Sequence, residues 1–299
     1  MTTSNSTRRQ FLAQSGLAAA AMCVGSASMA ADKKKPAFEI SLAQWTINRE
    51  LKSGKIDNLD FAKVASDHGI FAIEYVNQFF MDKANDKAYL GEMKKRAADL
   101  GVKSLMIMCD REGNIGDPDS AKRKKTVDNH RKWIDAAKFL GCHSIRVNAA
   151  SGGTWDEQVK LAADGLAKLT EFGAEQGLNV IVENHGGLSS NADWLAEVIQ
   201  TVNHKRCGTL PDFGNFRIKD GESYDSYRGI KKLMPWARGV SVKDLVWDDK
   251  ANQSALDYDR MLKIVLDAGF HGYCGIEHGG FEGLNASRKA LETVRDRLS

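Results

Sequence analysis

Cysteine and proline are both scarce in this 299-residue chain, which has five of the first and four of the second. No two cysteines form a close CxxC pair, so the sequence offers neither a disulfide scaffold nor the spacing of a zinc–thiolate site. We expect the cysteines beyond residue 30 to be small buried hydrophobes. The formal net charge is only +3, which gives no support for binding to nucleic acid or to a membrane surface.

The N-terminal segment has no apolar run long enough to remain in a bilayer. It carries a pair of arginines at 8–9, a short apolar stretch at 18–24 and a small-x-small site that ends at Ala30. This pattern predicts a twin-arginine (Tat) export signal over residues 1–30, followed by a linker at 31–36. We therefore expect the Tat export machinery as a partner, a periplasmic location and no stable membrane anchor. A basic tail without this role is the alternative.

Two common catalytic and cofactor motifs are missing as well. The chain has no GxSxG nucleophile elbow, and no glycine-rich phosphate loop follows the first expected strand. Gln44 and Trp45 stand at that position instead. An open doubly wound sheet, which usually carries such a loop, is therefore only the second choice of fold.

Short apolar runs alternate with helical patterns along the rest of the chain, and a glycine follows most of the helices, where a left-handed residue ends them. The expected strands cover residues 38–44, 71–76, 103–109, 143–148, 178–183, 207–212, 238–243 and 273–277. The expected helices cover residues 58–68, 86–100, 120–140, 155–176, 191–203, 224–235, 256–268 and 285–297. Eight strands joined by helices predict an α/β fold, a (β/α)8 TIM barrel that forms a single domain over residues 37–299.

Three of the last four strands end at a carboxylate: Glu183, Asp212 and Glu277. Strand ends of a β/α repeat converge on one mouth of the barrel, where such folds hold their chemistry. Three buried carboxylates repel one another unless cations compensate them, so they favour one divalent metal ion. Oxygen ligands suit Mn²⁺, our first choice, or Mg²⁺, while a nearby imidazole would extend the choice to Co²⁺, Fe²⁺ or Zn²⁺. Separate ion pairs with Lys243 and Arg146 are the alternative.

The clusters ENHGG at 183–187, DFGN at 212–215 and GIEHGG at 275–280 resemble those of xylose-isomerase-like TIM barrels, the sugar phosphate isomerase/epimerase family. The resemblance covers essentially the whole chain after the signal. It implies one divalent metal held by Glu183, Asp212 and Glu277, with the two glutamates moving protons on a small-molecule carbohydrate. Together with the signal, it is similar to an exported subgroup of the family.

One position departs from the family pattern. The resemblance places a histidine ligand on the seventh strand, where this chain has Ser241 in the run SVKD. We expect either three protein ligands with water, or a replacement ligand. His185 is the candidate, since it lies two residues past Glu183 and would share its facing if the strand continued. It is also a candidate catalytic acid.

Other polar residues near strand ends are expected to contact substrate. Lys243 faces the mouth two residues after Ser241 and is expected either to hold a substrate oxyanion or to pair with an acid. The remaining candidate substrate-binding residues are Asn148, Asn215, Glu74, Trp45 and Gln44.

These features predict a divalent-metal-dependent isomerase or epimerase. Glu183 and Glu277 would transfer the proton, and the reaction would pass through an enediolate. An exported enzyme is expected to act on an unphosphorylated sugar. A metal-dependent lyase or hydratase acting on 3-keto-glycosides is the second hypothesis, and a non-catalytic sugar-binding barrel is the third. The sequence leaves the oligomeric state open, including a homo-oligomer.

Overall fold

The computed structural model describes Met1 and residues 36–298. The expected export signal at 1–30, apart from Met1, and the expected linker at 31–36, apart from its last residue, lie outside the described residues. Residues 36–299 form one compact unit. Within the described part of the chain, no helix has both the length and the apolar character needed to cross a membrane.

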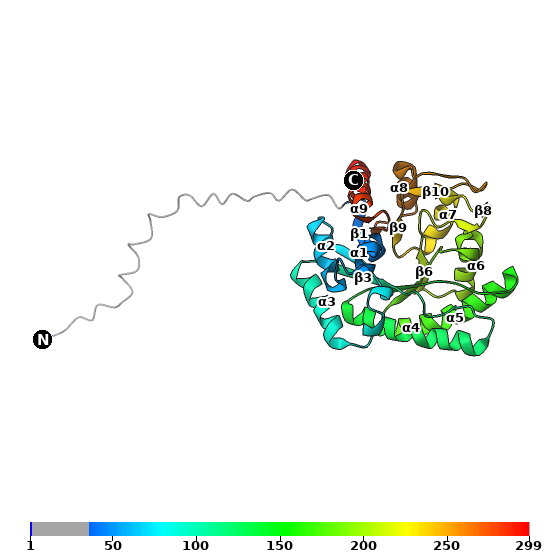
Figure 1. The fold of residues 1–299 in the computed structure, drawn as a ribbon, viewed down its shortest axis with the longest axis horizontal. Coiled ribbons are helices and arrows are strands. Elements are labelled where there is room, and N and C mark those ends of the chain that lie inside the picture. The colour runs from blue at the N-terminus through cyan, green and yellow to red at the C-terminus, as the bar shows by residue number, and fades with distance from the viewer. Residues whose placement is uncertain (2–35, 299) are drawn as a thin grey trace. The chain divides into compact units, whose positions relative to one another are not determined.

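A parallel sheet of eight strands forms the centre of this unit (Figure 1). The strands are β1 (Glu39–Ala43), β2 (Ala72–Val76), β3 (Lys103–Met108), β4 (Ser144–Val147), β5 (Asn179–Glu183), β6 (Cys207–Leu210), β9 (Val240–Val242) and β12 (Tyr273–Ile276). Their order is β6-β5-β4-β3-β2-β1-β12-β9. The first strand of the chain therefore pairs with the last, which confirms the expected (β/α)8 barrel.

The ring closes between β6 and β9, where single bridges replace a full ladder. Just after β6, the carbonyl of Pro211 accepts a hydrogen bond from the Ser241 N–H at 2.9 Å, and the Phe213 N–H donates to the Ser241 carbonyl at 3.0 Å. Asp212 lies between these two hydrogen bonds. The closure of the ring thus sets the position of a carboxylate at its mouth.

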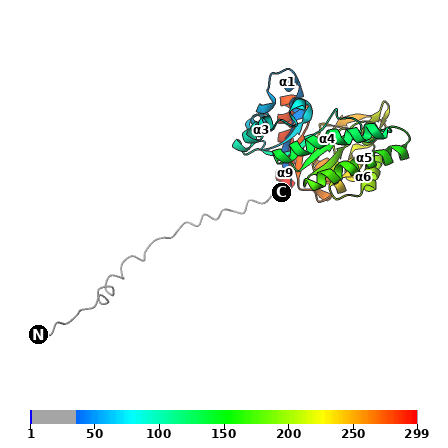
Figure 2. The same cartoon turned by 90° about the horizontal axis from the view of Figure 1, so that it is seen from below.

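Helices follow the strands and cover the outside of the ring. They are α2 (Phe61–Asp67), α3 (Lys87–Asp99), α4 (Ser120–Leu140), α5 (Trp155–Glu175), α6 (Ala192–Val202), α7 (Ser226–Leu233), α8 (Tyr258–Asp267) and α9 (Gly280–Leu298). Figure 2 shows α4, α5 and α6 side by side on one flank, in agreement with their mutual contacts. Asp, Asn or Thr side chains cap the N-termini of α3 to α8.

The glycines expected beyond the helix ends have the left-handed backbone that this position needs; Gly141, after α4, has φ of 86°. The four cysteines among the described residues are free and buried, as expected. One expected helix is longer than predicted, because α9 begins at Gly280 and not at residue 285.

Several short elements were not expected from the sequence. They are α1 (Asn48–Lys52), the antiparallel pairs β7 (Arg217–Lys219) with β8 (Glu222–Ser223) and β10 (Leu245–Trp247) with β11 (Gln253–Ala255), and 3-10 turns at Gln44–Ile47, Asn58–Asp60, Asn77–Phe79, Met81–Lys83, Gly187–Ser190 and Met234–Trp236. Most of them lie in the loops after β1, β2, β5, β6 and β9, and so surround the mouth of the barrel.

Two apolar clusters hold the fold together. The larger fills the space between the strands and the helices. The smaller lies inside the ring and consists of Ala43, Val76, Met106, Met108, Ile181 and Leu210. Polar residues also lie inside the ring, between this small cluster and the candidate site at the barrel mouth.

The loop between β3 and α4 packs against α5 through a glycine. A Cβ placed on Gly165 would lie 2.0 Å from the carbonyl oxygen of Ile115 in this loop. Ile115 is fully buried. The absence of a side chain at Gly165 therefore lets the backbone of the loop rest directly on the helix.

Replacement of Gly165 by alanine is expected to lower the free energy of unfolding by about 2 to 3 kcal/mol, since the methyl group must push the loop backbone away. Gly91 in α3 is a matched control, because a Cβ there meets no atom within 4 Å. Gly91→Ala should instead raise stability by about 0.5 to 1 kcal/mol through helix propensity. Urea unfolding followed by circular dichroism measures both; equal effects of the two substitutions would contradict this packing.

Candidate metal and catalytic centre

Three carboxylates meet at the mouth of the barrel, where the ends of strands distant in sequence come together. Glu183 ends β5, Asp212 follows β6 and Glu277 follows β12. Each offers one oxygen, and these oxygens lie within 4.8 Å of one another. All three residues are buried. The arrangement agrees with the convergence expected from the strand ends.

Asp212 is held by hydrogen bonds from the backbone and from Asn184. The Asn184 side chain accepts from the Asp212 N–H at 2.8 Å and donates to the Asp212 carbonyl at 2.9 Å. Oδ1 of Asp212 accepts from the backbone N–H groups of Gly214 and Asn215, each at 2.8 Å. The ENHGG and DFGN motifs thus hold each other, and they leave Oδ2 of Asp212 directed at the centre.

Asn215 was expected to contact substrate, and the structure places its amide on a catalytic candidate. Its Nδ2 donates to Oε1 of Glu183 at 2.9 Å. A hydrogen bond to this oxygen restrains the orientation of the carboxyl group.

Strand β9 brings a hydroxyl and an ammonium between two of the carboxylates. Oγ of Ser241 lies 2.7 Å from both Oδ2 of Asp212 and Oε2 of Glu277. Because a hydroxyl has a single proton, Ser241 donates to only one of them at a time. Nζ of Lys243 lies 3.2 Å from Oδ2 of Asp212 and 3.0 Å from Oε1 of Glu277.

A glycine makes room for this lysine. A Cβ placed on Gly214 would lie 2.9 Å from Cγ of Lys243. The glycine of the DFGN motif therefore allows the aliphatic stem of the lysine to pass close to the backbone.

The third carboxylate pairs with an arginine. Nε of Arg146, on β4, lies 2.9 Å from Oε2 of Glu183. The N–H does not point at this oxygen, so the contact is an ion pair without a hydrogen bond, and both atoms are buried without a hydrogen-bond partner. The sequence left open whether a metal or basic side chains compensate the acids. The structure shows the clustered carboxylates and both expected ion pairs together.

The two glutamates differ in their protonation. Burial, which dominates, together with the nearby charges of Glu277 and Asp212, raises the pKa of Glu183 to about 8 despite the opposing effect of Arg146. Burial also acts to raise the pKa of Glu277, but Lys243, Arg146 and the Ser241 hydroxyl outweigh it, so this pKa is lowered. The surroundings therefore favour the neutral form of Glu183 and the ionised form of Glu277.

Glu74 lies inside the barrel. Its Oε1 accepts from the Ser41 hydroxyl at 2.6 Å, while Oε2 is buried without a partner. A Cβ placed on Gly275 would lie 2.4 Å from Oε1 of Glu74, so this glycine of β12 provides the space for the carboxyl group. Burial, partly opposed by the bond from Ser41, raises the pKa of Glu74 to about 7.

Asp110, just past β3, is a member of the site that the sequence analysis did not single out. Its Oδ1 accepts from Nη1 of Arg146 at 2.8 Å and from Nδ2 of Asn148 at 2.9 Å. Its other oxygen accepts from Gln78 at 2.9 Å. The signal was present, because Asp110 is a carboxylate at a strand end like the other three.

The remaining candidate residues lie at the mouth or below it. Asn148 is half-buried and is bonded to Asp110, and His185 is exposed in the loop after β5. Gln44 is buried, accepting from the Val76 N–H at 2.9 Å and donating to Asn58 at 2.6 Å. The ring of Trp45 is half-buried, with Nζ of Lys52 at 4.1 Å from its centroid.

Two cavities are lined by residues of the barrel mouth. The first, of about 580 Å³, is lined by Glu277 and Lys243 together with Trp45, Arg49, Glu50 and Phe281. The second, of about 400 Å³, is lined by His185 and Asn215 together with Arg217, Trp247 and Gln253. Each has the size of a small-molecule site and contains one tryptophan and several groups that can bond hydroxyls.

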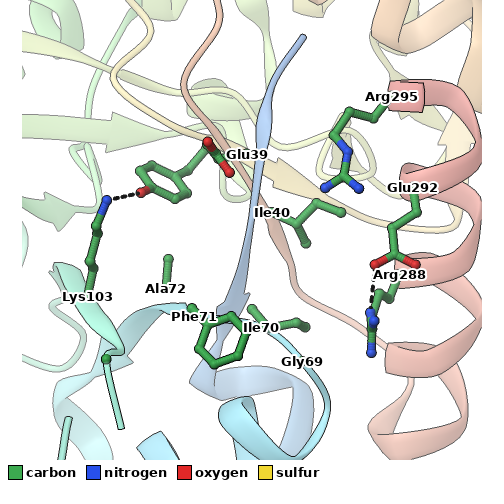
Figure 3. Close-up of a pocket in the computed structure, with 12 residues that line it drawn as sticks. Glu39, Ile40, Gly69, Ile70, Phe71, Ala72, Lys103, Arg288, Glu292 and Arg295 are labelled. Carbon is green, nitrogen blue, oxygen red and sulfur yellow. Dashed lines mark hydrogen bonds and ion pairs between the residues drawn. The ribbon is translucent and has the colours of Figure 1, made fainter. Parts of the chain in front are cut away.

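A separate pocket of about 240 Å³ lies at the opposite end of the barrel (Figure 3). It is formed where β1, β2, β3 and β12 begin. Arg288 pairs with Glu292 at 2.9 Å, and Lys103 contacts the Tyr273 hydroxyl at 3.4 Å. The active sites of TIM barrels lie at the carboxyl ends of the strands, so the mouth is the better candidate.

Comparison with known proteins identifies the family. A model of the family described as xylose isomerase-like TIM barrel matches residues 62–297. The chain belongs to this family. No curated protein matches the chain at a significant level.

Among solved structures, the chain is similar to 3-keto-D-glucoside 4-epimerase from E. coli, with 16% identity, a TM-score of 0.65 and coverage of 87% of this chain and 99% of that one. It is similar to a xylose isomerase-like TIM barrel protein from Mycobacterium smegmatis in complex with magnesium, with 15% identity, a TM-score of 0.65 and coverage of 87% and 96%. It is also similar to a probable 3-DHS dehydratase from Bacillus anthracis, with 17% identity, a TM-score of 0.62 and coverage of 85% and 99%. At these identities the likeness establishes the fold.

The donor set of this family member fits a divalent cation. All three grouped ligands are carboxylates, which suit Mg²⁺ or Mn²⁺, and Oε2 of Glu183 is a buried oxygen without a hydrogen bond. Within the described residues the group holds only Glu183, Asp212 and Glu277. His185 is not among them, because β5 ends at Glu183 and the backbone turns at Gly186, with φ of 81°.

The raised pKa of Glu74 predicts that stability falls as pH rises from about 4.5 to about 7, because the folded state then binds a proton that the unfolded state has lost. Glu74→Gln removes this cost. We expect the variant to be more stable than the wild type by about 2 to 3 kcal/mol at pH 8 and about equally stable at pH 4.5.

Urea unfolding midpoints at both pH values measure this difference. Glu92→Gln, at a half-exposed glutamate of α3, is the control and should give the same small change at both pH values. A Glu74→Gln effect that is independent of pH would show that the carboxyl group is not neutral at low pH in the folded state.

Proposed function

We propose that this protein is a divalent-metal-dependent isomerase or epimerase of an unphosphorylated sugar. The observation that supports this most is the meeting of Glu183, Asp212 and Glu277 within 4.8 Å at the barrel mouth. Membership of the family and its likeness to an epimerase support the same class of reaction.

The residues that would hold the metal are Glu183, Asp212 and Glu277, and Mn²⁺ is the first choice. When bound, the cation polarises a carbonyl and its neighbouring hydroxyl, which acidifies the C–H beside them. The likeness to a magnesium-bound barrel supports an ion of this type.

The proton transfer is assigned to the two glutamates. Glu277, with its lowered pKa, removes the proton from carbon, and the substrate becomes an enediolate. Glu183, the second glutamate of the group, is assigned the return of a proton. Return to the neighbouring carbon gives an isomer, while return to the opposite face of the same carbon gives an epimer. Lys243 lines the larger cavity and provides a cation for the oxygen on which charge develops.

We propose that the substrate carries no phosphate group because of the proposed export signal and periplasmic location. Sugar phosphates are metabolites of the cell interior, so a Tat-exported enzyme meets free sugars or glycosides. Of the expected substrate-binding residues, Asn148, Asn215 and Trp45 remain our proposed set, because Gln44 and Glu74 are fully buried. Among them, Trp45 lines the larger cavity and Asn215 lines the smaller one.

Incubation of the Mn²⁺-loaded protein with a panel of ketohexoses and aldohexoses in D₂O tests the proposal. A substrate should incorporate deuterium at one carbon without loss of sugar, as followed by NMR. Glu277→Gln should slow the exchange at least 100-fold, since general base catalysis contributes roughly 10² to 10⁴. Glu92→Gln should leave the rate unchanged. Sugar binding without exchange would instead support the non-catalytic sugar-binding barrel.

A second function is favoured by the shape of the mouth. One cavity at the mouth is lined by Glu277 and the other by Asn215, and each offers a tryptophan, so together they suit a substrate with two moieties. In a 3-keto-glycoside, removal of the proton next to the ketone lets the adjacent C–O bond to the aglycone break. The electron pair forms a C=C bond, and the aglycone leaves as its alcohol after taking up a proton. The likeness to a dehydratase supports such an elimination.

Trp247→Ala separates these two functions. If the substrate is a glycoside, the variant should raise the KM for a 3-keto-disaccharide by about tenfold or more while leaving the KM for methyl 3-keto-glucoside, whose aglycone is only methanol, unchanged. Release of the aglycone is measured by chromatography. Trp236→Ala is the control, because Trp236 follows α7 and lines neither cavity. An equal effect of Trp247→Ala on both sugars would contradict a two-moiety substrate.

A further inference from the structure

Lys243 occupies the place between two carboxylates that a metal ion would need. Its Nζ contacts Oδ2 of Asp212 at 3.2 Å and Oε1 of Glu277 at 3.0 Å. The lysine side chain is only 17% exposed. Lys243 differs from a surface lysine in an ordinary salt bridge, because both of its carboxylate partners belong to the group of candidate metal ligands.

Only one carboxylate oxygen of Asp212, Oδ2, is available to bind a metal ion. Its Oδ1 is already held by the N–H groups of Gly214 and Asn215. The free oxygen, Oδ2, is the atom that both Ser241 and Lys243 contact. A divalent ion that binds Asp212 must therefore compete with the ammonium for the same atom.

A divalent ion and the Lys243 ammonium cannot easily share Oδ2 of Asp212. A cation such as Mg²⁺ binds carboxylate oxygens at about 2.1 Å, so it would lie within a few ångströms of Nζ. Two positive centres at that separation in a buried site repel strongly. Ser241 does not relieve the conflict, because its hydroxyl is neutral and its single proton goes to either Asp212 or Glu277.

The larger cavity offers the ammonium another place. Lys243 and Glu50 both line it, and Oε2 of Glu50 is buried without a hydrogen-bond partner. A lysine that leaves Asp212 therefore enters a cavity lined by Glu50, whose Oε2 has no hydrogen bond. The same cavity is the proposed place of the substrate.

We propose that Lys243 is a built-in cation that holds the carboxylates together without metal, and that a divalent ion binds only by displacing its ammonium into the larger cavity beside Glu50. This inference rests on the proposed metal centre, and it adds an exchange between two cations. The affinity for metal would then be set by Lys243 as well as by the three ligands.

Calorimetric titration with MnCl₂ of the wild type and of Lys243→Met tests the exchange. Removal of the competing ammonium should tighten Mn²⁺ binding at least tenfold. Lys232→Met is the matched control, since Lys232 pairs with the half-exposed Asp193 on the outer surface, and its affinity should equal that of the wild type. Lys243→Gln provides a second neutral variant if Lys243→Met does not fold.

Thermal unfolding gives a readout independent of activity. Without metal, Lys243→Met should have a lower Tm than the wild type, since three carboxylates then face Arg146 alone as a cation. Saturating Mn²⁺ should raise the Tm of the variant by more than that of the wild type. In the wild type, Glu50→Gln should weaken Mn²⁺ binding several-fold, whereas in Lys243→Met it should have no effect.

Three results would overturn the proposal. Equal Mn²⁺ affinity of wild type and Lys243→Met would show that the ammonium does not compete. Weaker binding by Lys243→Met would show that lysine and metal act together. Unchanged affinity of Glu50→Gln would remove Glu50 as the receiving group. If no variant binds Mn²⁺, Mg²⁺ or Zn²⁺, the metal-dependent function fails together with the exchange, whereas the first three results leave that function standing.

Discussion

The burial of negative charge where the ring of strands closes is the constraint on which the site depends. Closure requires that the segment after β6 pair with β9, and this pairing brings Asp212 and Ser241 together inside the barrel. Glu183 and Glu277 come from the ends of β5 and β12, which are the neighbours of β6 and β9 in the sheet. Carboxylates in such a place are stable only beside cations, so the chemistry of the mouth is largely a question of which cation compensates them.

The sequence predicted the barrel and its three clustered acids for a simple reason. Parallel strands joined by helices all point the same way, so residues at their ends share one face whatever the loops do. The same rule applies to Asp110, which follows β3 and bonds Arg146, although it lies outside the ENHGG, DFGN and GIEHGG motifs that mark the other acids. His185 shows the limit of the rule, since it required a strand that in fact ends at Glu183.

Other features could not be read from the chain because they depend on contacts between distant segments. Whether Lys243 and Arg146 pair with the acids is decided by the register between strands, and the sequence left this open. The packing of the β3–α4 loop on Gly165 and the antiparallel pairs after β6 and β9 depend on neighbours that no local pattern reveals. The role of Gly275, which leaves space for Glu74, likewise appears only when two strands are placed side by side.

Strand β9 supplies the site with a positive charge through Lys243, and it has a hydroxyl, that of Ser241, where the resemblance implies a histidine ligand. A histidine ligand, which the family pattern places at the position of Ser241, would bring a neutral imidazole to the metal. Here the strand presents a hydroxyl and, two residues later on the same face, an ammonium. The hydroxyl adds no charge, but the ammonium adds a positive charge in a buried site, where it both stabilises the carboxylates and opposes a second cation. A centre built in this way is folded and charge-compensated before any metal arrives, so metal binding becomes an exchange and not an addition.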